Sequence, residues 1–181
     1  TNFGDYRPFL RALILALDAW VRDGKEPPAS VYPRLSDRTL VAWTQEAVAF
    51  PKIPSVRFPT VIQQPSFNDY GPLFLTRSII TVEPPRVIAD YVVLVPKSDA
   101  DGNDLGTLLP PEVGVPLGTY TWWNLRRQEF GADGALTNLQ GSFIPFPNDP
   151  KTNDPRAPIG KRYSGLKDYR SHLDDVVANM V

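Results

Sequence analysis

The most regular pattern of hydrophobic residues lies near the N-terminus and predicts an amphipathic helix over residues 5–23. Its apolar positions recur at three- and four-residue spacing, which gives one wide apolar stripe. They are Phe9, Leu10, Leu13, Ile14, Leu17, Trp20 and Val21. We expect Asp5 to cap the helix, Asp18 and Arg22 to pair one turn apart, and Gly24 to end it. So large a stripe needs a partner surface, which we expect to be a sheet.

A long irregular segment rich in proline follows, over residues 26–65. Two short elements are expected inside it, a strand at 39–43 and a turn of helix at 45–50. We favour an extended arm that wraps around the protein and is pinned by aromatic side chains. These are Tyr32, Trp43, Phe50, Phe58 and Phe67. The alternative is a flexible interdomain linker, although linkers carry fewer aromatic residues.

The middle of the chain has the hydrophobic pattern of strands. Residues 78–82 alternate, and the β-branched run VIADYVVLV at 87–95 predicts a strand covered on both faces. Residues 105–109 are expected to form a returning strand. The polar segment between them, SDADGNDLG at 98–106, reproduces the first ligand positions of a calcium loop. However, Asp104 occupies the position that needs glycine, so we prefer a hairpin turn.

The C-terminal third predicts loops, an apolar anchor and a second helix. Residues 130–142 are rich in Gly and Asn, FIPFP at 143–147 is apolar, and 148–159 are polar and rich in proline, which is typical of a surface loop. Apolar residues at helical spacing predict a helix over 166–181, with Ser164 as its cap. They are Leu166, Tyr169, Leu173, Val176, Val177 and Met180.

Composition narrows the classes of function. The 181 residues include 20 Pro and no Cys, and the net charge is −1. The Pro content, about twice the ~5% average, favours a loop-rich protein with few long helices. A near-neutral charge gives no electrostatic case for nucleic acid or an anionic membrane, and no apolar run reaches the roughly 20 residues that span a bilayer. Because the chain starts at Thr1 without Met or a signal sequence, we expect a fragment of a longer protein.

No complete catalytic apparatus is recognisable in the sequence. A hydrolase nucleophile usually lies in G-x-S-x-G, and neither Ser142 nor Ser164 has these flanking residues. His172, the only histidine, lies off the apolar face of its predicted helix and is interpreted as a surface residue. One His and no Cys argue against a zinc site, and there is no P-loop or dinucleotide fingerprint. We therefore expect no catalytic residue, metal or cofactor in these residues.

The segment PLGTYTWWNLRR at 116–127 is the best candidate for recognition. Aromatic rings supply contact area, and amide and guanidinium groups can hold a polar ligand group. Trp122, Trp123, Asn124 and Arg126 are the candidate substrate-binding residues. In the alternative, one Trp packs in the core while Asn124 and Arg126 satisfy loop backbone groups. Adjacent residues of an extended segment face opposite sides, so one Trp can be buried while the other lines a cleft.

Several stretches together resemble the large α/β-hydrolase-domain proteins. DYRPFLRALILALDAWV at 5–21, followed by GKEPPASVYP at 24–33, is similar to the last core helix of that family and the arm after it. DYVVLVPKSDADGNDLG, VPLGTYTWWNLR, LQGSFIPF and RYSGLKDYRSHL resemble further stretches in the same order. Where the family tends to have Gly, this chain has Trp122, which would narrow a pocket formed there. The resemblance implies that the nucleophile and the catalytic His precede residue 5.

The expected fold class is α/β, as the C-terminal segment of an α/β-hydrolase-like fold. It comprises a last core helix (1–24), a Pro-rich wrapping arm (25–76), a small antiparallel β subdomain with loops (77–162) and a terminal helix (163–181). The expected function is part of a serine ester hydrolase, contributing core packing and one wall of the cleft for a small-molecule substrate. Its partner would be the rest of the polypeptide, or a companion chain, carrying the hydrolase core. The alternative is a non-enzymatic binding or structural module that uses the cluster at 122–127. The sequence assigns no compartment.

Overall fold

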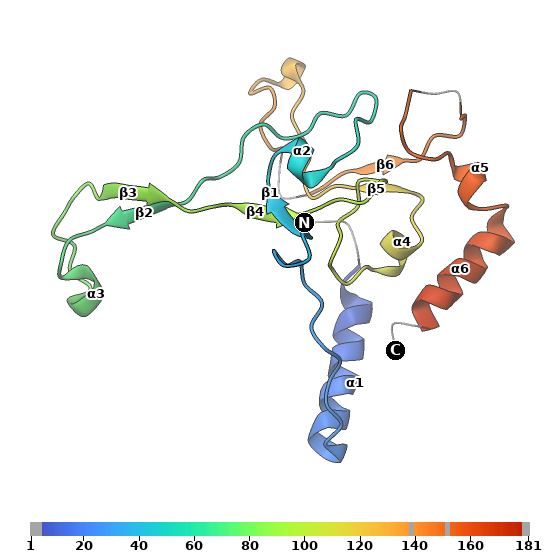
Figure 1. Cartoon of the computed structure of the whole chain (residues 1–181), viewed down its shortest axis with the longest axis horizontal. Helices are drawn as coiled ribbons and strands as arrows, with labels where there is room; N and C mark the ends of the chain where they lie inside the picture. Colours follow the sequence, from blue (N-terminus) through green and yellow to red (C-terminus); the bar gives the residue numbers. More distant parts are fainter. Residues whose placement is uncertain (1–4, 138–139, 151–152, 179–181) are drawn as a thin grey trace.

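The computed structural model describes residues 5–137, 140–150 and 153–178. These residues form a mixed α/β structure whose body carries two projections, a long helix and a β-hairpin that leave it in different directions (Figure 1). The strands of the described chain pair in antiparallel twos, β1 with β4, β2 with β3 and β5 with β6. The small antiparallel sheets expected from the sequence are therefore present.

The N-terminal helix is confirmed as α1, Arg7–Asp23. Asp18 and Arg22 form the predicted ion pair at 2.8 Å, and Gly24 ends the helix in the left-handed conformation. Its beginning differs from the prediction, because Tyr6 occupies the cap position without a side-chain cap. Asp5 lies one residue earlier, where its Oδ1 accepts the backbone N–H of Arg7 at 3.0 Å.

The Pro-rich segment contains the two short elements predicted for it. They are β1, Leu40–Ala42, and α2, Gln45–Val48, whose N-terminus is capped by the Thr44 hydroxyl. Of the aromatic residues expected to pin the segment, Phe50 is buried and Phe58 packs against the core, whereas Tyr32 and Phe67 are about half exposed.

The strand prediction for 78–82 is wrong, and that for 87–95 is confirmed only in part. Residues 78–82 are not a strand, and the run at 87–95 divides into β3, Arg86–Asp90, and β4, Leu94–Pro96. The partner of β3 is β2, Ser66–Asp69, and all five residues of β3 are exposed rather than covered on both faces. The reason is tertiary: the hairpin, which carries α3, Phe74–Arg77, at its tip, extends away from the body (Figure 1).

The turn predicted at 98–106 is present, but no strand follows it. Asp99 Oδ1 accepts the backbone N–H groups of Asp101 and Asn103, and Ser98 bridges Asp104 across the turn. Residues 105–109 were predicted to be a strand and form irregular backbone instead. Buried Asn103 fastens this turn to the next sheet, since its Oδ1 accepts the N–H of Tyr120 at 2.8 Å.

The C-terminal third surrounds a second hairpin. After α4, Pro111–Gly114, come β5, Gly118–Tyr120, the 3₁₀ turn Gln128–Phe130, and β6, Phe143–Pro145. The chain ends in α5, Ile159–Arg162, and α6, Leu166–Ala178. The second helix is thus confirmed over its described residues, while Met180 lies outside them. Ser164 does not cap it as predicted, because its hydroxyl and backbone N–H donate to Asp168.

The loop predicted at 148–159 is present over its described residues up to α5, but it is not all at the surface. Residues 148–159 were expected to be a surface loop, yet Arg156 is only 4% exposed. Its guanidinium pairs with Asp154 and donates to Thr119 Oγ1 and to the carbonyl oxygens of Ile144 and Pro145. The loop therefore supplies a buried ion pair that ties it to β5 and β6.

The main hydrophobic core lies where the Pro-rich segment meets the chain after β5. Its buried members are Val48, Phe50, Ile53 and Trp123. Val41, Val95, Leu125 and Ile144, among others, pack against it, so β1, β4 and β6 all contribute to one core. A helix outside this body, α1, has no buried residue.

Candidate functional site

The candidate segment at 122–127 follows a tightly packed strand. An added Cβ at Gly118 would lie 2.4 Å from the carbonyl oxygen of Ile144, so only glycine allows β5 to approach β6 this closely. Thr119 and Thr121 are fully buried, and the Thr121 hydroxyl donates to the carbonyl oxygen of Trp123 at 2.6 Å. Buried polar contacts at the beginning of the segment thus fix its conformation.

Trp123 is a core residue. It is 5% exposed, and its ring meets Phe50 and Phe58 edge to face, with centroid distances of 5.6 and 5.9 Å. Such aromatic pairs contribute about 0.5–1.5 kcal/mol beyond the burial of their area. Trp123 therefore holds the segment in place and is not on its surface.

The other three candidate residues lie closer to solvent. Trp122 is partly buried and packs against the core, while Asn124 and Arg126 are exposed. Their backbones are used: the Asn124 carbonyl accepts from Thr137, and Arg126 bonds Ala135 through its N–H and Arg57 through its carbonyl. Neither the Asn124 amide nor the Arg126 guanidinium has a hydrogen bond or ion pair with another described residue. Both groups can reach a ligand from a fixed backbone.

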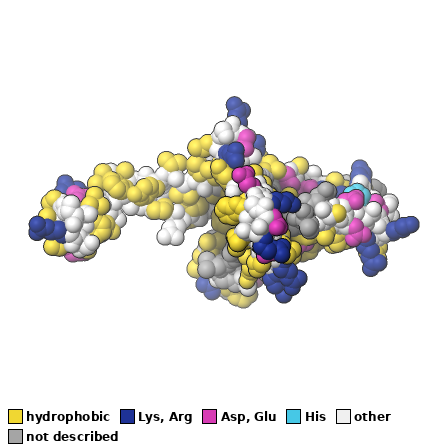
Figure 2. Space-filling view, turned by 90° about the horizontal axis from the view of Figure 1, so that it is seen from below, with side chains coloured by type: hydrophobic (Ala, Val, Ile, Leu, Met, Phe, Trp, Pro, Cys, Tyr) yellow, Lys and Arg dark blue, Asp and Glu magenta, His cyan; other side chains and the backbone are white. Residues whose placement is uncertain are grey.

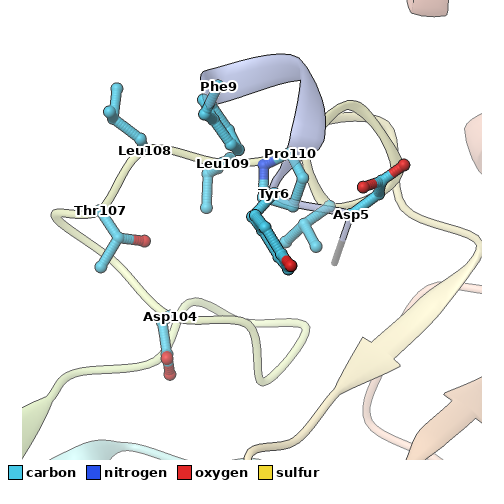
Figure 3. A pocket seen from close by; sticks show the side chains of 9 residues that line it. Asp5, Tyr6, Phe9, Asp104, Thr107, Leu108, Leu109 and Pro110 are labelled. Atoms are coloured by element: carbon cyan, nitrogen blue, oxygen red, sulfur yellow. The ribbon is translucent and has the colours of Figure 1, made fainter. Parts of the chain in front are cut away.

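A cavity of about 220 Å³ lies elsewhere, at the beginning of α1. One wall consists of Phe9 in α1, its cap residue Tyr6 and the preceding Asp5 (Figure 3). The other wall comes from the loop before α4 and includes Thr107, Leu108, Leu109 and Pro110. None of Trp122, Trp123, Asn124 and Arg126 lines it. Local sequence patterns did not indicate this cavity, because its two walls come from residues 5–9 and 104–113, far apart in the chain.

Asp104 gives this cavity an unusual electrostatic character. Burial, together with the nearby charge of Asp99, raises the pKa of Asp104 to about 6. Asp5, on the opposite wall, behaves in the contrary way, because hydrogen bonds from Arg7 hold its pKa near 2. One carboxyl group of the cavity thus titrates near neutral pH and the other stays charged.

We expect the Asp104→Asn variant to gain melting temperature at pH 8 and to gain little at pH 4. A carboxyl whose folded pKa is raised from 3.8 to about 6 favours the folded state below pH 4, and this contribution is lost as pH rises through 6. The neutral amide removes that loss. Melting curves from pH 4 to 8 measure this gain, with Asp174→Asn as the control, because Asp174 is exposed and has no ion pair or hydrogen bond through its side chain with the described residues. If the melting temperatures of the wild type and Asp104→Asn change in parallel with pH, the prediction is contradicted.

The residues with catalytic potential do not form a nucleophile–base pair in the described chain. His172 is exposed, and its Nδ1 lies 2.9 Å from the carbonyl oxygen of Asp168. The Ser142 hydroxyl donates to the carbonyl oxygen of Trp123, and the Ser164 hydroxyl donates to the Asp168 carboxylate, which also lies 3.3 Å from His172 Nδ1. Neither hydroxyl forms a hydrogen bond with His172, so neither serine has a histidine base. Among the described residues no cluster of three His, Asp or Glu side chains could hold a metal ion. The same residues include no helix long and apolar enough to cross a membrane.

Comparison with known proteins supplies one match that covers the chain. The family model described as alpha/beta hydrolase domain matches residues 1–181. No curated protein and no solved structure matches the sequence. The family match spans both projections, the core and the segment at 122–127.

Proposed function

Because the chain belongs to the alpha/beta hydrolase domain family, we propose that it is the C-terminal part of a serine ester hydrolase. In this proposal it packs on a hydrolase core and forms one wall of the cleft for a small-molecule substrate. The nucleophile and the catalytic His belong to that core, carried by the rest of the polypeptide or by a companion chain.

The uncovered apolar face of α1 carries this proposal. No residue of α1 is buried, and Val21 is 76% exposed. Within the described chain α1 makes no extensive contact with another helix or strand. Its other exposed large hydrophobic residues are Leu10, Leu13, Ile14, Leu15, Leu17 and Trp20. Exposure of so large an apolar stripe to water is unfavourable, and such a stripe can dock on a sheet. The core of an α/β hydrolase provides a sheet of this kind.

The segment at 122–127 is the part proposed to face the substrate. Trp123 anchors it in the core, which leaves the partly buried ring of Trp122 as an apolar surface beside two polar side chains. Asn124 and Arg126 are exposed and unpaired with described residues, as groups that orient a ligand must be before it binds. An amide and a guanidinium can donate hydrogen bonds to the carbonyl oxygen of an ester, or to a carboxylate elsewhere on the substrate.

We expect Asn124→Ala and Arg126→Ala in the full-length enzyme to lower kcat/KM by about 10-fold and up to about 100-fold, respectively. A neutral hydrogen bond contributes about 0.5–1.5 kcal/mol, and one to a charged group about 1.5–3 kcal/mol. Steady-state kinetics with a nitrophenyl ester measure the effect, and melting curves check that both variants keep their stability. The 181-residue chain alone should not hydrolyse the ester.

Arg127→Ala and the 181-residue chain are the two controls for the kinetic test. Arg127→Ala alters a neighbouring exposed arginine whose partner is Glu129 at 3.8 Å, and it should leave kcat/KM unchanged. Unchanged kcat/KM in both Asn124→Ala and Arg126→Ala would overturn the cleft-wall role and leave a structural one. Ester turnover by the 181-residue chain would contradict the placement of the nucleophile in the core.

A further inference from the structure

Residues 66–92, called here the arm and distinct from the wrapping arm predicted at 25–76, project from the body as β2, α3 and β3 (Figure 1). β2 and β3 pair with each other in antiparallel register and make no extensive contact with any other element of the described chain. A two-stranded hairpin on its own is marginally stable in water at best. The arm therefore needs a surface that the described residues do not supply.

Exposed apolar side chains occur along the whole length of the arm. Leu75 at the tip is 94% exposed and Val92 at the base is 84% exposed. The other exposed large hydrophobic residues of the arm are Phe67, Phe74, Ile79, Ile80, Val87, Ile88 and Tyr91. Figure 2 shows hydrophobic side chains along the projection, with charged groups gathered at its end. Exposed apolar surface on this scale marks an interaction site.

The polar groups of the arm are largely satisfied within it. Arg86 pairs with Asp69 at 3.5 Å, and the Ser66 hydroxyl donates to Asp90 at 2.8 Å. What remains for a partner is apolar area, roughly 500–1,000 Å² for nine side chains of this size. A stable interface needs about 800 Å² from each partner, and permanent interfaces are the more hydrophobic ones. The apolar character of this area favours a permanent partner over a transient one.

The edge of the arm argues against a second copy as that partner. The register between β2 and β3 shifts between Phe67 and Asn68, which leaves Ile88 without a partner in the ladder. A bulge of this kind twists an edge strand and hinders its pairing with another strand. Continuation of the hairpin into a sheet shared by two copies is thus disfavoured, and the faces of the arm are left for contact.

We propose that the arm clasps the hydrolase core, as a second contact separate from that of α1. The inference rests on the proposed function, because it takes its partner from there. The arm and α1 leave the body in different directions, so one core that touches both is held at two places (Figure 1). The apolar faces of the arm then lie against apolar surface of the core, and the marginal hairpin is stabilised by it.

The test compares variants in the full-length enzyme and in the 181-residue chain. Leu75→Asp and Val92→Asp should each lower the melting temperature of the full-length enzyme by about 5 °C, since each places a charge in an apolar interface. The same variants should leave the 181-residue chain unchanged, because both side chains are exposed there. Leu35→Asp is the matched control: Leu35 is 65% exposed, lies outside the arm and should have no effect.

Leu13→Asp on α1 separates failure of this inference from failure of the proposed function. If Leu13→Asp lowers the melting temperature of the full-length enzyme while both arm variants are silent, the arm inference is overturned and the docking of α1 stands. If none of the three variants lowers the melting temperature, both the arm inference and the proposed docking of α1 are overturned. Light scattering identifies a second copy: loss of a dimer in the arm variants would overturn the inference, as would an equal effect of Leu35→Asp.

Discussion

Arg156→Leu is expected to lower the free energy of unfolding by about 3–5 kcal/mol, the cost of leaving one partner of a buried ion pair alone. The side chains of Arg156 and Asp154 are 2% and 8% exposed, and their closest atoms are 2.7 Å apart. Leucine would leave the Asp154 carboxylate buried without its cation. It would also remove a donor from Thr119 Oγ1 and from two carbonyl oxygens that join β5 and β6.

Urea unfolding measures this loss, and its pH dependence identifies the cause. Hydrogen bonds from Arg156 hold the pKa of Asp154 below its ordinary value, so the pair stabilises the wild type above the unfolded pKa of 3.8. That contribution is lost as pH falls through the lower folded pKa. The Arg156→Leu variant should lack this acid dependence. The control Arg127→Leu breaks only an exposed pair and should cost less than about 1 kcal/mol. A similarly small cost for Arg156→Leu would contradict the assignment.

Gly141→Ala should also be severe, at about 3 kcal/mol or more, because its added atom would meet backbone rather than a movable side chain. A Cβ at Gly141 would lie 1.6 Å from the carbonyl oxygen of Thr121 and 2.6 Å from its carbonyl carbon. Relief requires the chain before β6 to move away from the chain after β5. That movement breaks the bond from the Thr121 N–H to the Ser142 carbonyl, which measures 2.9 Å. The segment that carries Asn124 and Arg126 would lose its support.

Thermal unfolding of the full-length protein measures the loss of stability, and the ester hydrolysis proposed for it measures the loss of support for the segment. Gly160→Ala is the matched control, since Gly160 lies in α5 with no atom within 4 Å of the added Cβ. It should be neutral or slightly stabilising, because alanine is the better helix former. A melting temperature for Gly141→Ala close to that of the wild type would show that the close approach is not needed for the fold.

The long helix α1 was predictable from local sequence alone. Its apolar spacing, the ion pair of Asp18 with Arg22 and the end at Gly24 are all properties of neighbouring residues, and all three are present. The short elements at 39–50 and the turn at 98–106 were likewise predictable, because turn and cap chemistry acts over a few residues. The candidate site was predictable only as a segment. Its sequence allowed either Trp to be buried, and the positions of Phe50 and Phe58 decide for Trp123.

The sequence by itself determined the amphipathic helices, the turn chemistry and the family, because these depend on residue spacing and on stretches of matching sequence. Only the tertiary structure decided which strands pair, which apolar residues are covered and which polar residues are buried. VIADYVVLV is hydrophobic enough for a covered strand, yet β3 projects from the body with every residue exposed. Arg156 lies in a polar, Pro-rich stretch and is buried, because Asp154, Thr119 and two strand carbonyls satisfy its guanidinium. Burial depends on partners distant in sequence, and local patterns do not contain them.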